Sequence, residues 1–529
     1  MAPLSGTQRP TVLEKKAPAS AERYRQEGIA LLEQNKTKEA LARFRSAVEL
    51  DPADAVSHDF IGGILAGAGL AAEAIGEFQR AIEIDPGYYP AYYHLALSYD
   101  RTGRTAEAIE EYQQALRLKP DLVEARYALS AACWKLGDVD GAISLLQETV
   151  AANPQSWHAR YDLGVELWHR YRIPGRLPEK ADLDEAILQL RVAAQQQPEQ
   201  PKIHLALGQV LAETLDPSGA VGILRKAADL APRDPTYCYN LGEALRTKGD
   251  LEEAEAELRK AIQLDPHQAP ARRSLGLVLR QKGDLKAAVI ELRLAASQLP
   301  EDAEVREKLG AVLLDLNDVS GAVSELRQAV RLDPQFFEAR LTLARALERA
   351  GQAATAQKER EEAERIEGLY RARGRAGVLL QAAADHLRAG DTAKALSELR
   401  EATTLSPDFA EAHYRLAAGL WQSSGDLTEI IKNLHTVLEL NPDHAQAHYL
   451  LGLARKKQGM TGLAKAEFSR ALELAPSLCD ALRALAEMAD ADRDWPKAIA
   501  EYQKYLAWRP NDDAAQKALS LAEENLKRK

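Results

Sequence analysis

The chain is built on a repeating pattern of apolar and polar positions, which is clearest between Pro235 and Gln268. This stretch of 34 residues predicts two amphipathic helices joined by a tight turn at Gly249. Leu241 and Leu245 lie on the apolar face of the first helix, and Leu258 lies on that of the second. Neither helix can bury its apolar face alone, so we expect the unit to stack on copies of itself.

Regularly spaced prolines show how far the unit repeats. Proline lacks a backbone N–H and keeps the preceding residue out of the helical region, so it ends one helix before the next begins. Most of these prolines are 34 residues apart, and they are Pro52, Pro86, Pro120, Pro154, Pro198, Pro232, Pro266, Pro300, Pro334, Pro407, Pro442, Pro476 and Pro510. We predict fourteen repeats, thirteen of them with the proline.

The unit resembles the tetratricopeptide repeat. The places that carry the resemblance are the seventh (Leu241), eighth (Gly242), twentieth (Ala254), twenty-fourth (Leu258), twenty-seventh (Ala261) and thirty-second (Pro266). The resemblance implies an all-α, right-handed superhelical solenoid of tandem helix-turn-helix repeats. It also implies that ligands lie in a concave groove lined by the first helices.

The repeats follow one another through most of the chain. In order they are residues 21–54, 55–88, 89–122, 123–156, 157–200, 201–234, 235–268, 269–302, 303–336, 337–370, 376–409, 410–444, 445–478 and 479–512. Below they are called repeats one to fourteen.

The domain organisation follows from where the pattern starts, breaks and ends. Residues 1–20 are rich in Pro, Ser and Lys and are expected to be disordered. Repeats one to ten form a first array, 21–370, and repeats eleven to fourteen a second one, 376–512. Between them lies a basic connector, 371–375. Residues 513–529 are predicted to form an amphipathic helix that caps the last repeat.

Two repeats depart from the pattern. Repeat ten lacks the closing proline and has Arg360 at a place where the others have Leu, Phe or Tyr, so we expect the array to bend or slip near the connector. Repeat five contains about ten extra residues near 170–179. Pro174 and Pro178 within this insertion predict a loop and not a longer helix.

Composition narrows the function classes. The chain has 529 residues, with 68 Lys and Arg against 79 Asp and Glu, for a formal charge of −11. This balance argues against nucleic acid as a partner, since phosphate-binding proteins present a basic face. Cys133, Cys238 and Cys479 are far apart and are expected to be buried, unpaired thiols.

The sequence contains no apolar run long enough for a membrane span. Its start has no continuous apolar core typical of a signal peptide, so a cytoplasmic location is the default expectation. Export stays open if the start of the chain is trimmed or wrongly assigned.

No motif points to catalysis. The sequence has no phosphate-binding loop, no zinc-binding HExxH helix, no Cys-x-x-Cys pair and no glycine-rich dinucleotide turn. His58, His204, His413 and His448 all fall at the fourth place of a repeat, where they are expected to fill the core. We therefore expect no catalytic residue, no metal and no cofactor.

Aromatic residues at groove-facing places are the candidate binding site. In the family, the fifth and twelfth places face the groove, and basic residues of the insertion follow the second tryptophan. The candidates are Tyr93, Tyr127, Trp134, Tyr161, Trp168, Arg172 and Arg176. The alternative is that these rings pack against neighbouring helices.

The leading prediction is a non-catalytic scaffold that binds a peptide or a partner protein in its groove. The alternative is a structural protein that self-associates by packing of its solenoids. A regulatory module of an enzyme would need a catalytic domain, and the repeats leave no room for one.

Overall fold

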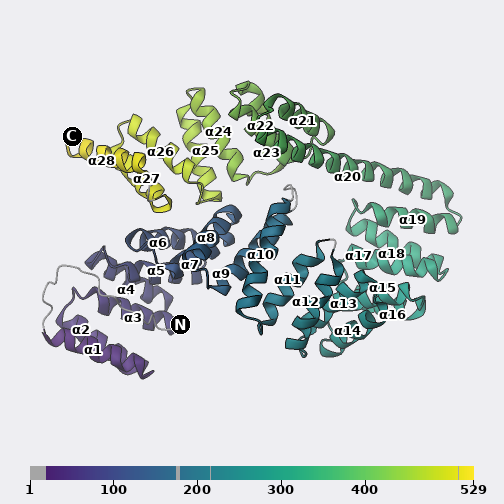
Figure 1. The fold of residues 1–529 in the computed structure, drawn as a ribbon, viewed down its shortest axis with the longest axis horizontal. Coiled ribbons are helices and arrows are strands. Elements are labelled where there is room, and N and C mark those ends of the chain that lie inside the picture. The colour runs from purple at the N-terminus through teal and green to yellow at the C-terminus, as the bar shows by residue number, and fades with distance from the viewer. Residues whose placement is uncertain (1–18, 174–178, 215, 510–511, 529) are drawn as a thin grey trace. The chain divides into compact units, whose positions relative to one another are not determined.

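The fold is known from a computed structural model that describes residues 19–173, 179–214, 216–509 and 512–528 (Figure 1). Within these residues the chain forms 28 α-helices in tandem and no β-strand. The prediction of an all-helical repeat protein is therefore confirmed. Of the segment expected to be disordered, residues 1–18 lie outside the described residues, and the first helix already begins at Ala19.

The helices fall into two compact units. The first unit comprises Met1–Asn153 and Gly459–Lys529, and the second comprises Pro154–Gln458. These units do not coincide with the two arrays expected from the sequence.

The first unit contains repeats one to four and the end of the chain. Its helices are α1 (Ala19–Glu33), α2 (Thr37–Leu50), α3 (Ala55–Gly67), α4 (Ala71–Ile84), α5 (Tyr89–Arg101), α6 (Thr105–Leu118), α7 (Val123–Lys135), α8 (Val139–Ala152), α25 (Thr461–Leu474), α26 (Cys479–Ala491), α27 (Trp495–Trp508) and α28 (Asp513–Arg528).

The second unit contains the middle of the chain. Its helices are α9 (Trp157–Tyr171), α10 (Lys180–Gln196), α11 (Pro201–Ala212), α12 (Pro217–Leu230), α13 (Pro235–Lys248), α14 (Leu251–Leu264), α15 (Ala269–Gln281), α16 (Leu285–Gln298), α17 (Ala303–Asp315), α18 (Val319–Leu332), α19 (Phe337–Arg349), α20 (Ala353–Arg388), α21 (Thr392–Leu405), α22 (Ala410–Gln422), α23 (Leu427–Leu440) and α24 (Ala445–Lys457).

Small residues let the two helices of a repeat cross closely. A Cβ atom added to Gly242 in α13 would lie 2.7 Å from Cγ of Leu258 in α14, so the leucine fills the space that glycine leaves. Ala254 beside this contact is fully buried. Gly249 ends α13 in the left-handed conformation, with φ of 96°, which glycine adopts without strain. The register inferred from the sequence is therefore correct.

The fourth place of a repeat carries a polar brace that the sequence did not reveal. In α17, Arg306 donates from Nε to the Pro300 carbonyl at 3.0 Å and from Nη1 to Glu325 of α18 at 3.0 Å. One side chain thus ties the end of the preceding repeat to both helices of its own. Arg272 and Arg340 make the same contacts with their own proline carbonyls and glutamates.

Histidines occupy the same place elsewhere and also form hydrogen bonds. A ring nitrogen of His204 lies 2.8 Å from the Pro198 carbonyl oxygen. His58 instead lies 2.6 Å from Glu77 of its own repeat. His58 and His204 are buried, as expected, and their ring nitrogens also form these hydrogen bonds.

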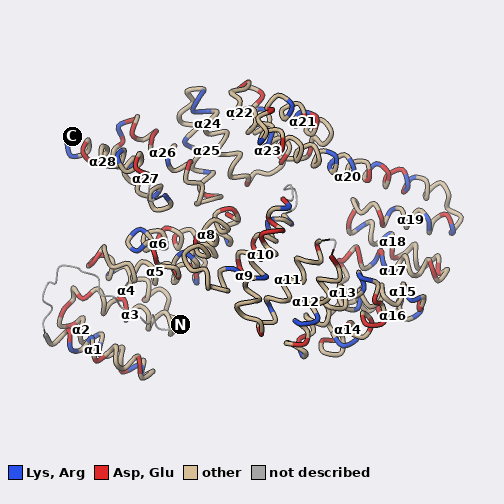
Figure 2. The backbone as a smooth tube through the Cα atoms, viewed as in Figure 1, with Lys and Arg blue, Asp and Glu red and all other residues tan. Residues whose placement is uncertain are grey.

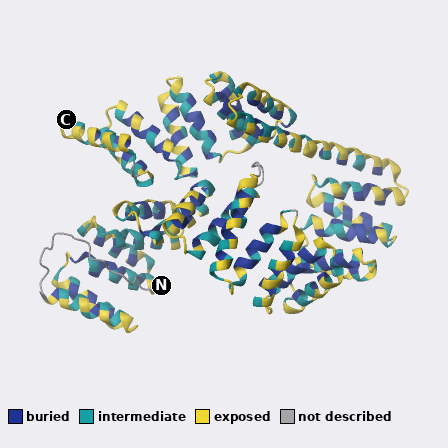
Figure 3. Cartoon of the chain, in the orientation of Figure 1, coloured by how far each residue is buried: buried dark blue, intermediate teal, exposed yellow. Residues whose placement is uncertain are grey.

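Repeats ten and eleven share one continuous helix, α20 (Figure 1). The residues expected to connect two arrays, 371–375, lie inside it. Gly368 stands where the other repeats have proline, and glycine lowers helix propensity without removing a hydrogen-bond donor. Much of α20 is exposed (Figure 3), including Leu369 and Tyr370. The missing proline therefore produces a fused helix and not a break in the chain.

The insertion in repeat five is only partly a loop. Helix α9 has 15 residues and α10 has 17, whereas the corresponding helices of repeat eight, α15 and α16, have 13 and 14. Five residues of the insertion therefore extend the two helices. The prediction of a loop without helix extension is therefore wrong for half of the insertion. Residues 174–178 of the insertion, among them Arg176, lie outside the described residues.

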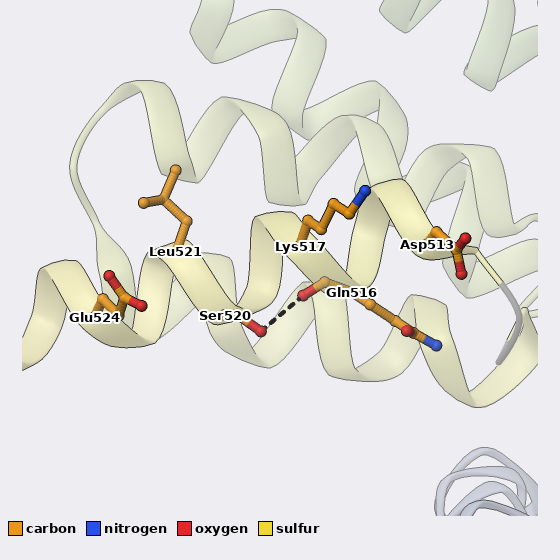
Figure 4. A pocket seen from close by; sticks show the side chains of 6 residues that line it. All are labelled: Asp513, Gln516, Lys517, Ser520, Leu521 and Glu524. Atoms are coloured by element: carbon orange, nitrogen blue, oxygen red, sulfur yellow. Dashed lines mark hydrogen bonds between the residues drawn. The ribbon is translucent and has the colours of Figure 1, made fainter.

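Helix α28 packs on α27 and continues the last core through Ala515 and Ala522. Leu526 near its end is exposed. The opposite surface of α28 has a shallow hollow of about 460 Å³ (Figure 4), lined by Asp513, Gln516, Lys517, Ser520, Leu521 and Glu524. All six side chains come from one helix, so we assign no ligand to this hollow.

Candidate functional site

The first unit holds three of the predicted aromatic residues on two parallel first helices. Helix α5 carries Tyr93, and α7 carries Tyr127 and Trp134, which are seven residues apart and so lie on one side of the helix. We call these three residues the aromatic strip. Tyr127 is 38% exposed, and the other two rings are half-buried against the core of repeats one to four.

A buried ring packs against one end of the aromatic strip. The Tyr93 ring centroid lies 6.1 Å from that of Tyr112 in α6, a side chain that is fully buried. Burial also raises the pKa of Tyr93, with a smaller contribution from Glu124, so this phenol stays neutral. The strip therefore presents neutral aromatic surface on a rigid base, as a site for apolar contacts requires.

Charged residues beside the strip are already paired. Lys135, next to Trp134, lies 2.8 Å from the Asp100 carboxylate of the preceding repeat. Asp59 in α3 is buried and lies 2.8 Å from Nδ1 of His94. Burial opposes protonation of His94, but the Asp59 carboxylate outweighs it and raises the pKa of this imidazole. The sequence did not reveal the Asp59–His94 pair, because its members lie 35 residues apart at unrelated repeat places.

In the second unit, Trp168 occupies the same repeat place as Trp134 but is nearly covered. Its side chain is 9% exposed, and its buried indole nitrogen has no hydrogen-bond partner. The guanidinium carbon of Arg172 lies 5.1 Å from the ring centroid, and Nε of Arg172 lies 3.5 Å from Glu213. For Trp168 the alternative of a packed ring is therefore the better description.

The remaining predicted tyrosine, Tyr161, forms a separate cluster with a cation. Nζ of Lys202 in α11 lies 4.8 Å from the Tyr161 ring centroid and 5.0 Å from that of Trp157. An ammonium over aromatic faces is attracted by their negative charge distribution. The second unit therefore offers a cation held by two rings, in addition to the covered tryptophan.

Further along the second unit, the first helices carry a chain of ion pairs. Arg246 pairs with Glu243 at 3.0 Å in α13, and Arg273 in α15 pairs with Glu304 in α17 at 2.8 Å. Burial alone would raise the pKa of Glu243, but hydrogen bonds from Arg246 lower it. Acidic and basic residues alternate in this way along many helices (Figure 2). The pair of Arg273 and Glu304 links neighbouring repeats.

The described residues contain no group of His, Cys, Asp or Glu side chains arranged to hold a metal ion. Cys133, Cys238 and Cys479 are buried and unpaired, as predicted. Of the helices in the described part of the chain, none has both the length and the apolar composition that a membrane span needs.

Comparison with protein families decides the classification. Models described as tetratricopeptide repeat match residues 25–89, 93–156, 127–179 and 380–429 in one case, 161–367 in a second and 445–478 in a third. The chain is a tetratricopeptide-repeat protein. The match at 445–478 has the bounds predicted for repeat thirteen, and members of this family generally serve as non-catalytic scaffolds for protein interactions.

A comparison with solved structures also found similar chains. YrrB, described as a TPR protein with an unusual peptide-binding site, is 25% identical, with 39% of this chain and 97% of YrrB covered and a TM-score of 0.33. Yeast Tom70 is 15% identical, with 83% and 96% covered and a TM-score of 0.34. MamA from Desulfovibrio magneticus RS-1 is 24% identical, with 32% and 94% covered and a TM-score of 0.30. None of these scores supports an argument about function. A comparison with curated protein sequences found no match.

Proposed function

We propose that this tetratricopeptide-repeat protein is a non-catalytic scaffold that binds a peptide or a partner protein on the first-helix face of repeats three and four. The observation that supports this most is the aromatic strip, in which Tyr127 is exposed and Tyr93 and Trp134 are half-buried on a packed base. Aromatic anchors of this kind supply large contact area at low entropic cost and carry much of an interface's binding energy.

The chemistry of the strip defines the partner we expect. Its rings are neutral, and Lys135 beside them is paired with Asp100, so the central contact is apolar. We therefore propose an extended or helical partner segment that is apolar in the middle.

Arg172 in the second unit is the proposed contact for an acidic group of the partner. Its side chain is 55% exposed, and its ion pair with Glu213 at 3.5 Å is one that a partner carboxylate can replace. This is a separate proposal for the second unit, and Arg176 is proposed for the same role from its place in the sequence alone.

Selection from a library of displayed peptides tests the proposal without knowledge of the partner. The full-length protein is used as bait, and the same protein with Tyr127→Ala and Trp134→Ala is used for counter-selection. We expect the enriched peptides to share apolar residues at helical or alternating spacing and to lose binding to the double variant. Equal enrichment on both baits would remove the strip as the binding surface.

Self-association is a second candidate, which one feature of the second unit favours. Leu369 and Tyr370, adjacent residues of α20, are 53% and 55% exposed, and adjoining exposed apolar side chains are typical of contact surfaces. Light scattering across a concentration series distinguishes the two. A constant mass supports the monomeric scaffold, and a mass that rises with concentration supports self-association.

A further inference from the structure

Within the first unit, the end of the chain returns to repeats three and four. The turn between α25 and α26 reaches the start of α8, where the backbone N–H and the hydroxyl of Ser477 both donate to Asp138 at 2.9 Å. Helix α27 contacts α6 in the same unit, and Trp508 at its end packs against the core of repeats one to four. Residues more than 300 positions apart in sequence thus form one contact.

Asp138 and Gly141 both take part in the contact with Ser477. The Asp138 carboxylate is buried and also accepts the Gly141 N–H at 3.0 Å, so it caps α8 and holds Ser477 at once. A Cβ atom added to Gly141 would lie 2.5 Å from Cβ of Ser477 and would overlap its hydroxyl. In other repeats, a Cβ atom added to the glycine at the same place would contact only the aspartate that caps the same helix, as for Gly321 and Asp318.

The burial of Gln113 on the outer surface of α6 is a second indication of the contact. Gln113 is 7% exposed, whereas its equivalents in other repeats, among them Gln79 and Arg293, are exposed. Because α27 contacts α6, the burial of this polar side chain agrees with the position of the C-terminal helices. The signal is independent of the hydrogen bonds of Ser477.

The contact joins two parts that each have a core of their own. Repeats one to four share one apolar cluster, and α26, α27 and α28 share another. The link between them includes a buried carboxylate, and burying this group raises the pKa of Asp138 despite its hydrogen bonds. Interfaces that are partly polar between separately packed parts are typical of parts that move relative to each other.

We propose that the turn at Ser477 and helices α26, α27 and α28 form a releasable arm, which docks on repeats three and four of the same chain through Ser477 and α27 and uncovers α6 when it leaves. Release breaks the two hydrogen bonds of Ser477, while the bond from Gly141 keeps α8 capped by Asp138. Trp508 packs against both apolar clusters, so release withdraws this ring from repeats one to four but leaves the buried residues of each cluster with their own helices.

Thiol labelling of the full-length protein tests the arm. Gln113→Cys places a reporter under α27, and Gln79→Cys places the control at the same repeat place in repeat two. The three native cysteines are buried, and mass spectrometry identifies which site has reacted. We expect the reporter to label at least about tenfold more slowly than the control, because labelling requires release of the arm. Equal rates at the two positions would overturn the proposal.

Two further variants open the arm by different means. Gly141→Ala is expected to bring labelling of the reporter close to the control rate with unchanged helical content, whereas the matched variant Gly321→Ala leaves it slow. Ser477→Asp, which sets a carboxylate against Asp138, is expected to act in the same direction. A reporter that stays slow in both opening variants would show that the arm is fixed. If dilution of the Gln113→Cys protein raises its labelling rate to that of the control, the contact forms between two copies of the chain. That result would also overturn the proposal.

Discussion

The first unit and the second unit contain a tryptophan at the same repeat place, with different surroundings. Trp134 of the first unit is half-buried beside exposed Tyr127, whereas Trp168 of the second unit is nearly covered beneath Arg172. The insertion extends α9, and Arg172 directly follows the extended helix. A repeat place therefore fixes which side of the helix a residue occupies, but the sequence that follows decides whether its side chain is available to a partner.

A glutamate shows the same kind of contrast. Glu291 of the second unit pairs with the brace residue Arg272 at 2.9 Å. Glu111 occupies the equivalent place in the first unit, but the fourth place there is Tyr92, which donates to the Pro86 carbonyl instead. Burial, with a smaller contribution from Glu110, raises the pKa of Glu111 to about 7. The same repeat place thus holds a glutamate in an ion pair in one unit, whereas burial disfavours the ionised form of Glu111 in the other.

The largest expected effect is on stability, from removal of the covered ring. We expect Trp168→Ala to lower the free energy of unfolding by about 3–5 kcal/mol, because it leaves a cavity in a packed site. Urea denaturation followed by circular dichroism measures this loss. The matched variant Trp134→Ala is expected to lose clearly less, since its ring is more exposed. Equal losses of unfolding free energy in the two variants would contradict the difference in packing between Trp168 and Trp134.

The next effect is on binding. We expect Trp134→Ala and Tyr127→Ala each to weaken binding of a selected peptide by roughly 2 kcal/mol, about 30-fold in Kd, with helical content unchanged. Isothermal titration calorimetry with the full-length variants measures the change. Leu294→Ala, at an exposed position on the second helix of repeat eight, is the control and should bind like the parent. A Tyr127 variant with full affinity would place the site elsewhere.

The pH dependence of stability sharpens the contrast between the glutamates. The folded-state pKa of Glu111 lies above its ordinary value of 4.5, so the folded chain holds this proton more tightly than the unfolded chain does. The contribution of Glu111 to the stability of the fold is favourable below about pH 4.5 and is lost as the pH rises through about 7. We expect Glu111→Gln to stabilise the protein at pH 8 by on the order of 1 kcal/mol, because the side chain is only half-buried.

Urea unfolding at several pH values between 4.5 and 8 measures this effect. Glu111→Gln should flatten the fall in stability across that range. Glu291→Gln serves as the control and is expected to destabilise, since it takes the charge from the partner of Arg272. A Glu111 variant with the same pH profile as the parent would contradict the raised pKa.

The smallest effect concerns the cover over Trp168. We expect Arg172→Ala to cost about 0.5–1 kcal/mol of stability, the usual size of a cation–π contact at an exposed site. The same variant should make Trp168 more reactive toward oxidising radicals, which mass spectrometry detects. Unchanged reactivity would mean that other side chains cover the ring.

Much of the fold could be predicted from the sequence, because the repeat makes each place visible many times. The contact between Gly242 and Leu258 follows from small and large residues that recur with the same spacing. The fused helix α20 could not be predicted as readily, since the loss of a proline shows where a helix end is missing but not what replaces it. Glycine at position 368 permits the helix to continue, and only the folded chain shows that it does.

The candidate site was less visible in the sequence. The fifth and twelfth repeat places correctly assigned the rings to the first helices. The surroundings of Trp168 were not predictable in this way, because Arg172 lies over its ring and pairs with Glu213 of the next repeat. The polar brace was missed for a similar reason, because its glutamate lies 19 residues from its arginine and its carbonyl belongs to the preceding repeat.

Hydroxyl-radical footprinting of the full-length protein, with and without a selected peptide, tests the account most directly. It reports on Tyr127, Trp134 and Trp168 in one experiment. We predict that Tyr127 and Trp134 are oxidised in the free protein and protected in the complex, while Trp168 reacts slowly in both. Protection confined to Trp168, or no protection of Tyr127 and Trp134 in a saturated complex, would contradict a partner surface on repeats three and four.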